Sequence, residues 1–272
     1  MIVATSTQGI WELLKHLYQQ DKRDYVVGIG GSECSGKTYL SERMEAYAKG
    51  SEYQIFTFHL DAYLKYDRNR RKSQAKKYRG EDSMFFEIGD HPECFDFSAL
   101  QNHIRFLLTE GTLPYIRRYN SVLGRVVQEP CTFRRTGKMI VLVEGIFALS
   151  EKLVQFYDTT LFVEASKEVL WQRFLKRHQE RENSSYEEIC DTFQEKTVPA
   201  FHKYIEPTRQ NAQIIVDTSD DVVATVAESS QSAALERTGC VALRGNGVMG
   251  ERGRPELLFR RAEIGNFNTS ER

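Results

Sequence analysis

The length, composition and charge of the chain exclude several classes of protein. With 272 residues, 40% hydrophobic side chains and 28% charged ones, the sequence is typical of a globular domain that buries a sizeable core. Its formal net charge of −1 gives no overall attraction for nucleic acid, and no apolar stretch reaches the roughly 18 residues that span a bilayer. Five scattered cysteines without a C-x-x-C pair indicate reduced thiols. We therefore expect a cytoplasmic protein whose partner is a small molecule rather than nucleic acid or a membrane, and we leave homo-oligomerisation open.

Apolar periodicity predicts helices and strands in alternation up to residue 217. The helical patterns cover residues 9–20, 37–49, 99–111, 167–181 and 186–205. The β-rich runs cover residues 24–31, 52–61, 139–147, 159–165 and 212–217. Ser98 with Gln101 predicts a capping box at the third helix and Gly111 its end, while Pro199 is expected to kink the last helix. Such alternation is typical of an α/β fold with a parallel sheet.

Two segments depart from this alternation. Residues 62–90 are polar and charged without an apolar period, and we assign residues 62–135 to an exposed excursion that binds the substrate. From residue 221 the sequence DVVATVAESSQSAALERTGC predicts one further helix, and the Gly- and Arg-rich remainder to residue 272 predicts a poorly ordered tail. Acidic and basic residues balance in this tail, which disfavours RNA binding. The folded domain is thus expected at residues 1–220.

A glycine-rich motif follows the first of these predicted strands. Residues 31–38, GSECSGKT, match G-x-x-x-x-G-K-[ST] between a strand and a helix, the context in which this pattern binds nucleotide phosphates. Backbone N–H groups of such a P-loop surround the β-phosphate, Lys37 reaches the β- and γ-phosphates, and Thr38 binds Mg²⁺. The competing dinucleotide-binding pattern, G-x-G-x-x-G, would begin at Gly28 and Gly30 and would need a glycine where Glu33 stands, so it is disfavoured. The expected nucleotide-binding residues are Gly31, Ser32, Glu33, Cys34, Ser35, Gly36, Lys37, Thr38 and Tyr39.

Two carboxylates at the ends of later strands point to the reaction. Asp61 closes the run 52–61, and Glu144 lies in the most apolar run of the chain. The carboxyl ends of parallel strands face the ligand crevice of such a sheet. Asp61 is therefore a candidate base, which would accept a proton from a substrate hydroxyl that attacks the γ-phosphate. A GTPase is disfavoured because no guanine-reading N-K-x-D motif is found.

Six motifs together resemble one known family. GGSECSGKT, HLDAYLKYDR, GDHPECFDFSAL, VLVEGIFAL, LFVEASKEVLWQRFLKRHQER and VPAFHKYIEPTRQNAQIIVD follow one another within about residues 22–218. In this order they look like the phosphoribulokinase/uridine kinase family, whose members use MgATP to phosphorylate a hydroxyl of a ribose-type substrate. The resemblance implies an α/β P-loop kinase with a parallel sheet flanked by helices, a small substrate-binding excursion and a helical lid. It also implies ATP and Mg²⁺ as cofactors.

The resemblance gives the matching residues individual roles. It implies Asp61 as the base, Glu144 near Mg²⁺, Asp90 as a holder of substrate hydroxyls, and a phosphate-gripping lid at about 173–186. Arg173 joins Lys37 and Asp61 in the expected catalytic set. Further expected contacts are Tyr63, His91, Tyr119, Asn120, Arg173 and Lys176 to the substrate, and Arg177 and Arg181 to the nucleotide.

The acceptor stays open between two branches of this family. GDHPECFD is close to the uridine kinase pattern and favours uridine or cytidine. However, LPYIRRYNSVLGR lacks the base-recognising His of uridine kinases, and Arg181-Glu-Asn-Ser replaces their Arg-Gly-Arg-Asp. YNSVLG and DAYLKYDRNRRK instead resemble the phosphoribulokinase branch, whose sugar-phosphate acceptor Arg117, Arg118 and the basic run 68–77 would contact. A nucleotide-binding regulatory protein without turnover is the third hypothesis.

Overall fold

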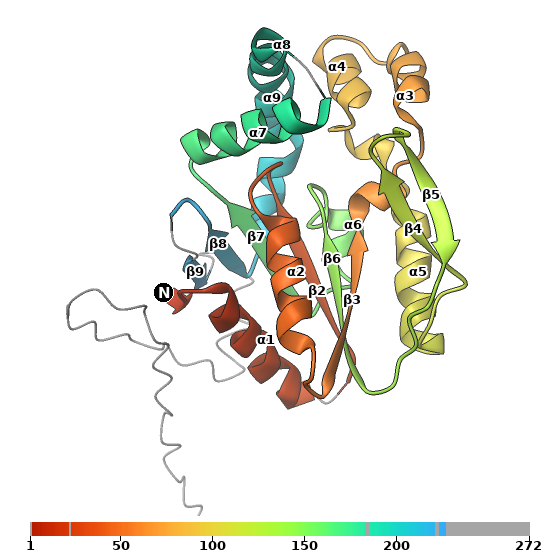
Figure 1. Cartoon of the computed structure of the whole chain (residues 1–272), viewed down its shortest axis with the longest axis vertical. Helices are drawn as coiled ribbons and strands as arrows, with labels where there is room; N and C mark the ends of the chain where they lie inside the picture. Colours follow the sequence, from red (N-terminus) through yellow and green to blue (C-terminus); the bar gives the residue numbers. More distant parts are fainter. Residues whose placement is uncertain (1, 22, 183–184, 221–222, 227–272) are drawn as a thin grey trace, which may run out of the picture.

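A mostly parallel sheet of seven strands forms the centre of the molecule (Figure 1). The computed structural model describes residues 2–21, 23–182, 185–220 and 223–226. Its parallel strands are β2 (Tyr25–Gly31), β3 (Tyr53–His59), β6 (Lys138–Glu144), β7 (Thr159–Glu164) and β8 (Ile214–Asp217). They lie in the order β8-β7-β2-β6-β3, so that β2 is central and fully buried. These strands are the ones that the apolar runs predict, and the predicted α/β fold is confirmed.

Two short antiparallel strands extend the β8 edge of the sheet. β9 (Val223–Val226) pairs with β8, and β1 (Ile2–Ala4) pairs with β9. The prediction of a helix from residue 221 is therefore wrong for residues 223–226, where β-branched side chains favour the extended backbone that the edge of β8 can bind. The domain boundary expected at residue 220 lies between β8 and β9, which are paired strands of the same sheet. The rest of the predicted helix and tail, residues 227–272, lies outside the described residues.

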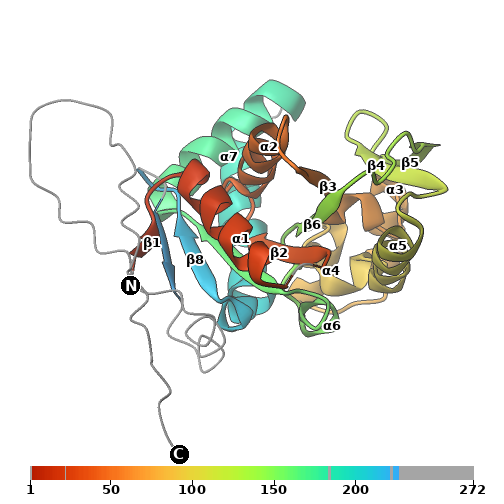
Figure 2. The ribbon, with the colours of Figure 1, turned by 90° about the horizontal axis from the view of Figure 1, so that it is seen from below.

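Helices cover both faces of the sheet (Figure 2). On one face lie α1 (Thr7–Asp21) and α2 (Lys37–Ala48), whose Leu14 and Met44 are buried against the strands. On the other face lie α5 (Phe97–Glu110) and the short α6 (Glu151–Val154), which bury Ile104 and Leu153. A sheet covered on both sides is what its uniformly apolar strands require. No helix within the described ranges is long and apolar enough to cross a membrane.

The segment between β3 and β6 is more ordered than its composition predicts. It contains the 3-10 turns η1 (Leu60–Tyr63) and η2 (Pro92–Cys94), helices α3 (Arg68–Ala75), α4 (Glu81–Ile88) and α5, and a hairpin of β4 (Tyr115–Asn120) with β5 (Arg125–Pro130). Phe85 and Phe86 anchor α4 in the interior, so residues 62–90 are not simply an exposed excursion. Asp96, rather than Ser98, caps α5 by accepting a hydrogen bond from the Ala99 amide at 3.0 Å.

A helical arm follows β7 and carries the expected lid. It contains α7 (Lys167–Glu182) and α8 (Tyr186–Asp191), and the capping box of Ser185 and Glu188 at α8 is present as expected. The chain continues through the π-helical η3 (Thr192–Thr197), α9 (Val198–Ala200), the π-helical η4 (Phe201–Ile205) and the 3-10 turn η5 (Glu206–Asn211). Pro199 lies in α9 and has no N–H to donate, which accounts for a change of helix type around it.

Candidate functional site

Residues 31–38 join β2 to α2 through a turn that requires glycine. Gly31 has a φ of 137°, and a Cβ built on it would lie 2.0 Å from the carbonyl oxygen of Val163. Gly36 has a φ of 99° directly before α2 begins. Cys34 has a φ of 61°, which few residues other than glycine adopt. The close approach and the left-handed backbone give the motif its shape, and the turn ends at a helix N-terminus suited to a phosphate.

The amino group of Lys37 reaches back across this loop. Its Nζ donates a hydrogen bond to the Ser32 carbonyl oxygen at 2.6 Å, and the residue is buried. Burial lowers the pKa of the Lys37 ammonium, while the charges of Glu144 and Asp61 oppose that shift. A cation held at the loop between carboxylates is suited to phosphate oxygens.

Glu144 lies beside Thr38 at the first turn of α2. Thr38 Oγ1 donates a hydrogen bond to Glu144 Oε1 at 3.2 Å, and His59 Nδ1 lies 2.6 Å from the same oxygen. Burial alone would raise the pKa of the Glu144 carboxyl, but the hydrogen bond with His59 and the charge of Lys37 outweigh it and lower that pKa. Mg²⁺ in kinases takes one or two protein carboxylates and fills its other positions with phosphates and water. The hydroxyl of Thr38 and the carboxylate of Glu144 therefore fit the protein's share of such a site.

The described residues contain no group of three or more His, Cys, Asp and Glu side chains that could hold a metal by themselves. His59, which the sequence patterns did not single out, contacts Glu144 from the last position of β3. Its place at a strand end, two residues before Asp61, was the available signal.

Asp61 and Asp90 are electrostatically coupled beside the P-loop. The side chain of Asp61, in η1, has an exposed surface. Even so, the protein atoms packed around its carboxyl group desolvate it and raise its pKa, and the negative charge of Glu144 raises that pKa further. Asp90 follows α4, and burial, reinforced by the charges of Glu33 and Asp61, raises its pKa to about 8. A raised pKa makes Asp61 a stronger base, and it makes Asp90 a hydrogen-bond donor at neutral pH.

Arg173 joins the P-loop to the end of β8. Its Nη1 donates hydrogen bonds to Thr218 Oγ1 at 2.9 Å and to the Cys34 carbonyl oxygen at 3.4 Å, and Nη2 donates to the Thr218 carbonyl oxygen at 2.7 Å. Thr218 Oγ1 in turn donates to the Ser35 carbonyl oxygen at 2.8 Å. We expected Arg173 to contact the reacting groups, but in this structure its guanidinium binds the protein. Thr218 was missed, although a polar residue directly after a parallel strand lies at the ligand edge.

The other expected nucleotide-binding residues occupy different environments. Arg177 Nη1 lies 3.3 Å from Glu33 Oε1, which pairs the lid helix with the P-loop. Burial alone would raise the pKa of Glu33, but the hydrogen bond with His178 and the charge of Arg177 outweigh it and lower that pKa. Tyr39 and Lys176 are exposed. The side chain of Arg181 and residues 183–184 of the expected lid lie outside the described part of the chain.

Two expected substrate contacts are buried in the protein interior. Tyr63 is 2% exposed, and its hydroxyl forms a hydrogen bond with His103 Nδ1 at 2.8 Å. His91 is 6% exposed, and its Nδ1 accepts a hydrogen bond from the Glu93 amide at 3.2 Å. Neither side chain offers surface to a ligand in this structure. Their neighbours in the sequence, Asp61 and Asp90, lie close enough to the P-loop for the charge of Lys37 to act on both carboxyls.

In the β4–β5 hairpin, the expected substrate contacts Tyr119 and Asn120 interact with the protein itself, and Arg117 is the side chain with an unused donor. Asn120 Oδ1 accepts a hydrogen bond from the Leu123 amide at 2.9 Å and so shapes the turn, while Tyr119 packs against the core. The Arg117 guanidinium lies 4.9 Å from the centre of the Tyr63 ring, and its Nε has no hydrogen-bond partner among the described residues. The hairpin therefore places the half-buried Arg117 side chain against Tyr63.

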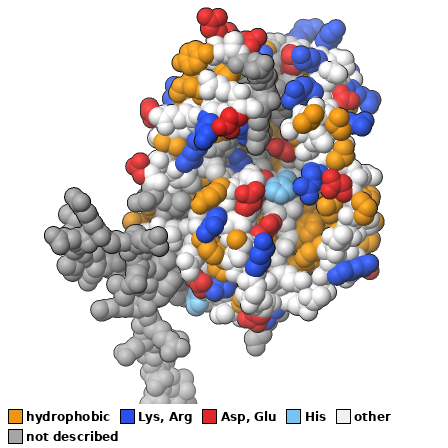
Figure 3. Space-filling model, in the orientation of Figure 1, with side chains coloured by type: hydrophobic (Ala, Val, Ile, Leu, Met, Phe, Trp, Pro, Cys, Tyr) orange, Lys and Arg blue, Asp and Glu red, His pale blue; other side chains and the backbone are white. Residues whose placement is uncertain are grey.

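Arg71 is a second arginine of the excursion, and its side chain is more deeply buried than that of Arg117. The residue is 5% exposed, its Nε donates to the Glu87 carbonyl oxygen at 3.3 Å, and its Nη1 has no hydrogen-bond partner within the described ranges. Its positive charge acts on Asp90. Figure 3 shows further Lys and Arg side chains on the surface over α3. The sequence indicates a basic run at 68–77, but it does not indicate that one of these cations turns inward.

Comparisons with known proteins match most of the chain to one family. Residues 26–225 match the family model described as "Phosphoribulokinase / Uridine kinase family". The chain is 26% identical over 194 residues to a uridine kinase of Vibrio cholerae serotype O1, an alignment that covers 70% of this chain and 85% of the relative. It is 25% identical over 228 residues to a uridine kinase of Streptococcus thermophilus, with 78% and 99% covered. The structure of a D-glycerate 3-kinase from Cryptococcus neoformans shares the fold, with a TM-score of 0.57, 12% identity, and 81% and 99% covered.

Proposed function

Since the chain belongs to the phosphoribulokinase/uridine kinase family, we propose that it transfers the γ-phosphate of ATP to a ribose hydroxyl of a pyrimidine nucleoside, uridine or cytidine. Members of this family are ATP-dependent phosphotransferases that act on hydroxyl groups, and the chain is one of them. The choice of a nucleoside is supported by the uridine kinases among its relatives and by Asp90 of the GDHP segment.

The observation that carries the proposal is the convergence of Lys37, Asp61, Asp90 and Glu144 on the P-loop. In the proposed reaction the loop amides and Lys37 hold the phosphates, and Asp61 accepts the proton of the acceptor hydroxyl as its oxygen attacks the γ-phosphorus. Thr38 and Glu144 would hold Mg²⁺, which neutralises charge on the phosphates when bound. Asp90 carries a proton at neutral pH, so it can both donate to and accept from ribose hydroxyls.

A sugar phosphate is the second candidate acceptor, and one observation favours it. Arg71 Nη1 and Arg117 Nε are buried without hydrogen-bond partners among the described residues. Buried guanidinium nitrogens of this kind are satisfied when a phosphate or carboxylate binds them. A pyrimidine nucleoside carries no such group.

An ADP-release assay with a panel of acceptors separates these candidates. We expect uridine and cytidine to give the highest kcat/KM, ahead of adenosine, ribose and ribulose 5-phosphate. A kcat/KM for ribulose 5-phosphate well above that for uridine would favour the second candidate. ADP formation that no acceptor increases would instead favour a regulatory nucleotide-binding protein. The Lys37→Ala variant, purified in the same way, serves as the control for contaminating kinases.

A further inference from the structure

The last residues of two neighbouring strands form a polar pair at the edge of the sheet that carries the P-loop. His59 ends β3 and Glu144 ends β6, and the parallel register of the two strands sets these residues directly opposite each other. Side chains of a strand alternate between its two faces, so this pair shares the face of Ile55 and Ile140. Both isoleucines belong to the core that α1 and α2 cover. His59 and Glu144 therefore point toward α2, whose second residue is Thr38.

In the described part of the chain, Glu144 accepts two hydrogen bonds, and both reach the same carboxylate oxygen. Thr38 Oγ1 donates to Glu144 Oε1 at 3.2 Å, and His59 Nδ1 lies 2.6 Å from that oxygen. An ionised carboxylate can only accept, so the His59 ring nitrogen carries the hydrogen and donates it. Oε2 accepts neither of these bonds, which leaves it available to a ligand.

The two donors to Glu144 differ in what else they have to do. The Thr38 hydroxyl is itself an expected ligand of Mg²⁺, whereas the bond to Glu144 is what the His59 ring contributes at this site. The His59 side chain is 47% exposed, while Glu144 is 6% exposed, so a half-exposed ring binds a buried carboxylate. Carboxylates that bind metals commonly have such an outer hydrogen-bond partner, and its loss lowers metal affinity or activity by about 10–100-fold.

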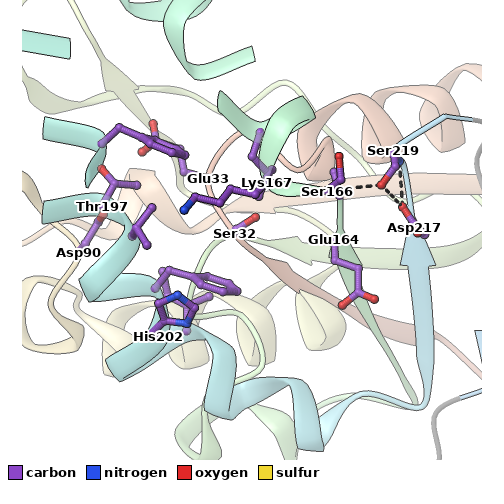
Figure 4. A pocket seen from close by; sticks show the side chains of 16 residues that line it. Ser32, Glu33, Asp90, Glu164, Ser166, Lys167, Thr197, His202, Asp217 and Ser219 are labelled. Carbon is purple, nitrogen blue, oxygen red and sulfur yellow. Dashed lines mark hydrogen bonds between the residues drawn. The ribbon is translucent and has the colours of Figure 1, made fainter. Parts of the chain in front are cut away.

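His59 lies apart from the cavity beside the P-loop (Figure 4). That cavity meets the P-loop at Ser32 and Glu33 and reaches the ends of β7 and β8, on the other side of β2 from β3 and β6. Neither His59 nor Glu144 is among the described residues that line it. The geometry therefore gives His59 a contact with Glu144 rather than with a ligand in this cavity.

We propose that His59 is a positioning residue, which holds the Glu144 carboxylate beside Thr38 so that both can bind Mg²⁺ together with the nucleotide. This inference rests on the proposed use of MgATP, and it does not depend on which acceptor is phosphorylated. The alternative is a purely structural role, in which the bond only ties β3 to β6. The two roles predict different effects of Mg²⁺ on variants of His59.

The Kd for ATP, measured by titration calorimetry in saturating Mg²⁺ and in EDTA, separates these roles on the full chain. We expect the wild type to bind ATP more tightly in Mg²⁺, and His59→Leu to lose about tenfold or more of this gain. In EDTA its Kd should stay within about twofold of wild type, because the metal is then absent from both proteins. His59→Asn should keep the gain within about threefold of wild type, since its amide nitrogen is bonded to Cγ as Nδ1 is and can replace that donor.

Lys138→Met is the matched control for the structural role. Lys138 Nζ lies 2.8 Å from Glu52 Oε2, and this pair joins the start of β6 to the residue before β3, at the opposite ends of the same two strands. The Lys138 side chain is 46% exposed, close to the value for His59. We expect this variant to keep the whole gain in ATP affinity from Mg²⁺.

Three results would overturn the proposal: an unchanged gain in His59→Leu, an equal loss of affinity in Mg²⁺ and in EDTA, or a His59→Asn protein that behaves like His59→Leu. His59→Ala also removes the donor and is the second test if His59→Leu does not fold. A wild-type protein that gains no ATP affinity from Mg²⁺ would contradict the MgATP site of the proposed function, and this inference with it.

Discussion

Replacing Thr218 with valine removes one hydroxyl that ties three segments of the chain together. Thr218 Oγ1 donates to the Ser35 carbonyl oxygen at 2.8 Å and accepts from Arg173 Nη1 at 2.9 Å. A neutral hydrogen bond contributes about 0.5–1.5 kcal/mol to stability and a charge-assisted one about 1.5–3 kcal/mol. Arg173 keeps its bond to the Thr218 carbonyl oxygen. We therefore expect the free energy of unfolding to fall by about 2–4.5 kcal/mol.

Denaturant unfolding and ATP titration together check this reasoning. Because the lost bonds hold the P-loop at Ser35, we expect the Kd for ATP to rise about tenfold, equivalent to about 1.4 kcal/mol of binding free energy. Thr208→Val is the matched control, since its hydroxyl donates to the Ile205 carbonyl oxygen at 2.7 Å in the helical arm. It should lose about 1 kcal/mol of stability and leave ATP affinity unchanged. A Thr218→Val protein with wild-type stability and ATP affinity would refute the conclusion that the Thr218 hydroxyl holds the P-loop in place.

Three further predictions concern the P-loop and its neighbours. Gly31→Ala should abolish measurable ATP binding, because the new Cβ would lie 2.0 Å from the Val163 carbonyl oxygen; a wild-type Kd would contradict the loop geometry. Lys37→Ala should lower kcat by about 10²–10³-fold in the ADP-release assay, through loss of a preorganised cation, and unchanged turnover would rule out the P-loop assignment. The folded pKa of Asp90, about 8, lies above the ordinary carboxyl value, so this group favours the folded state at low pH and loses that contribution as the pH rises toward 8. Asp90→Asn should therefore gain stability relative to wild type between about pH 4 and 8, measured by denaturant unfolding across that range, and a pH-independent difference would contradict the shift.

The elements that the sequence predicts well are those that short-range patterns determine. The buried strands follow from continuous apolar runs, and the P-loop follows from glycine spacing that only one local geometry satisfies. Asp61 and Glu144 were predicted to lie at the ligand edge because strand ends in a parallel sheet share one edge. These inferences need no knowledge of which distant segments meet.

The elements that sequence patterns missed depend on long-range contacts. β9 forms a strand because it lies between β1 and β8, and four residues alone do not reveal that pairing. Arg71 is buried by contacts from α4, although its own sequence reads as a solvated basic run. Tyr63 and Arg173 were expected at a ligand, but His103 and Thr218, which lie 40 and 45 residues away in the chain, occupy their polar groups.

The measurement that tests the proposed reaction most directly is the turnover of Asp61→Asn with ATP and uridine. Asparagine keeps the shape of the side chain but cannot accept the proton of the attacking hydroxyl. We predict that kcat falls by roughly 10²–10⁴-fold while the Kd for ATP stays within about twofold of wild type. A variant that retains kcat but loses ATP affinity would contradict the role of Asp61 as the base, and it would place that carboxylate in the nucleotide or metal site instead.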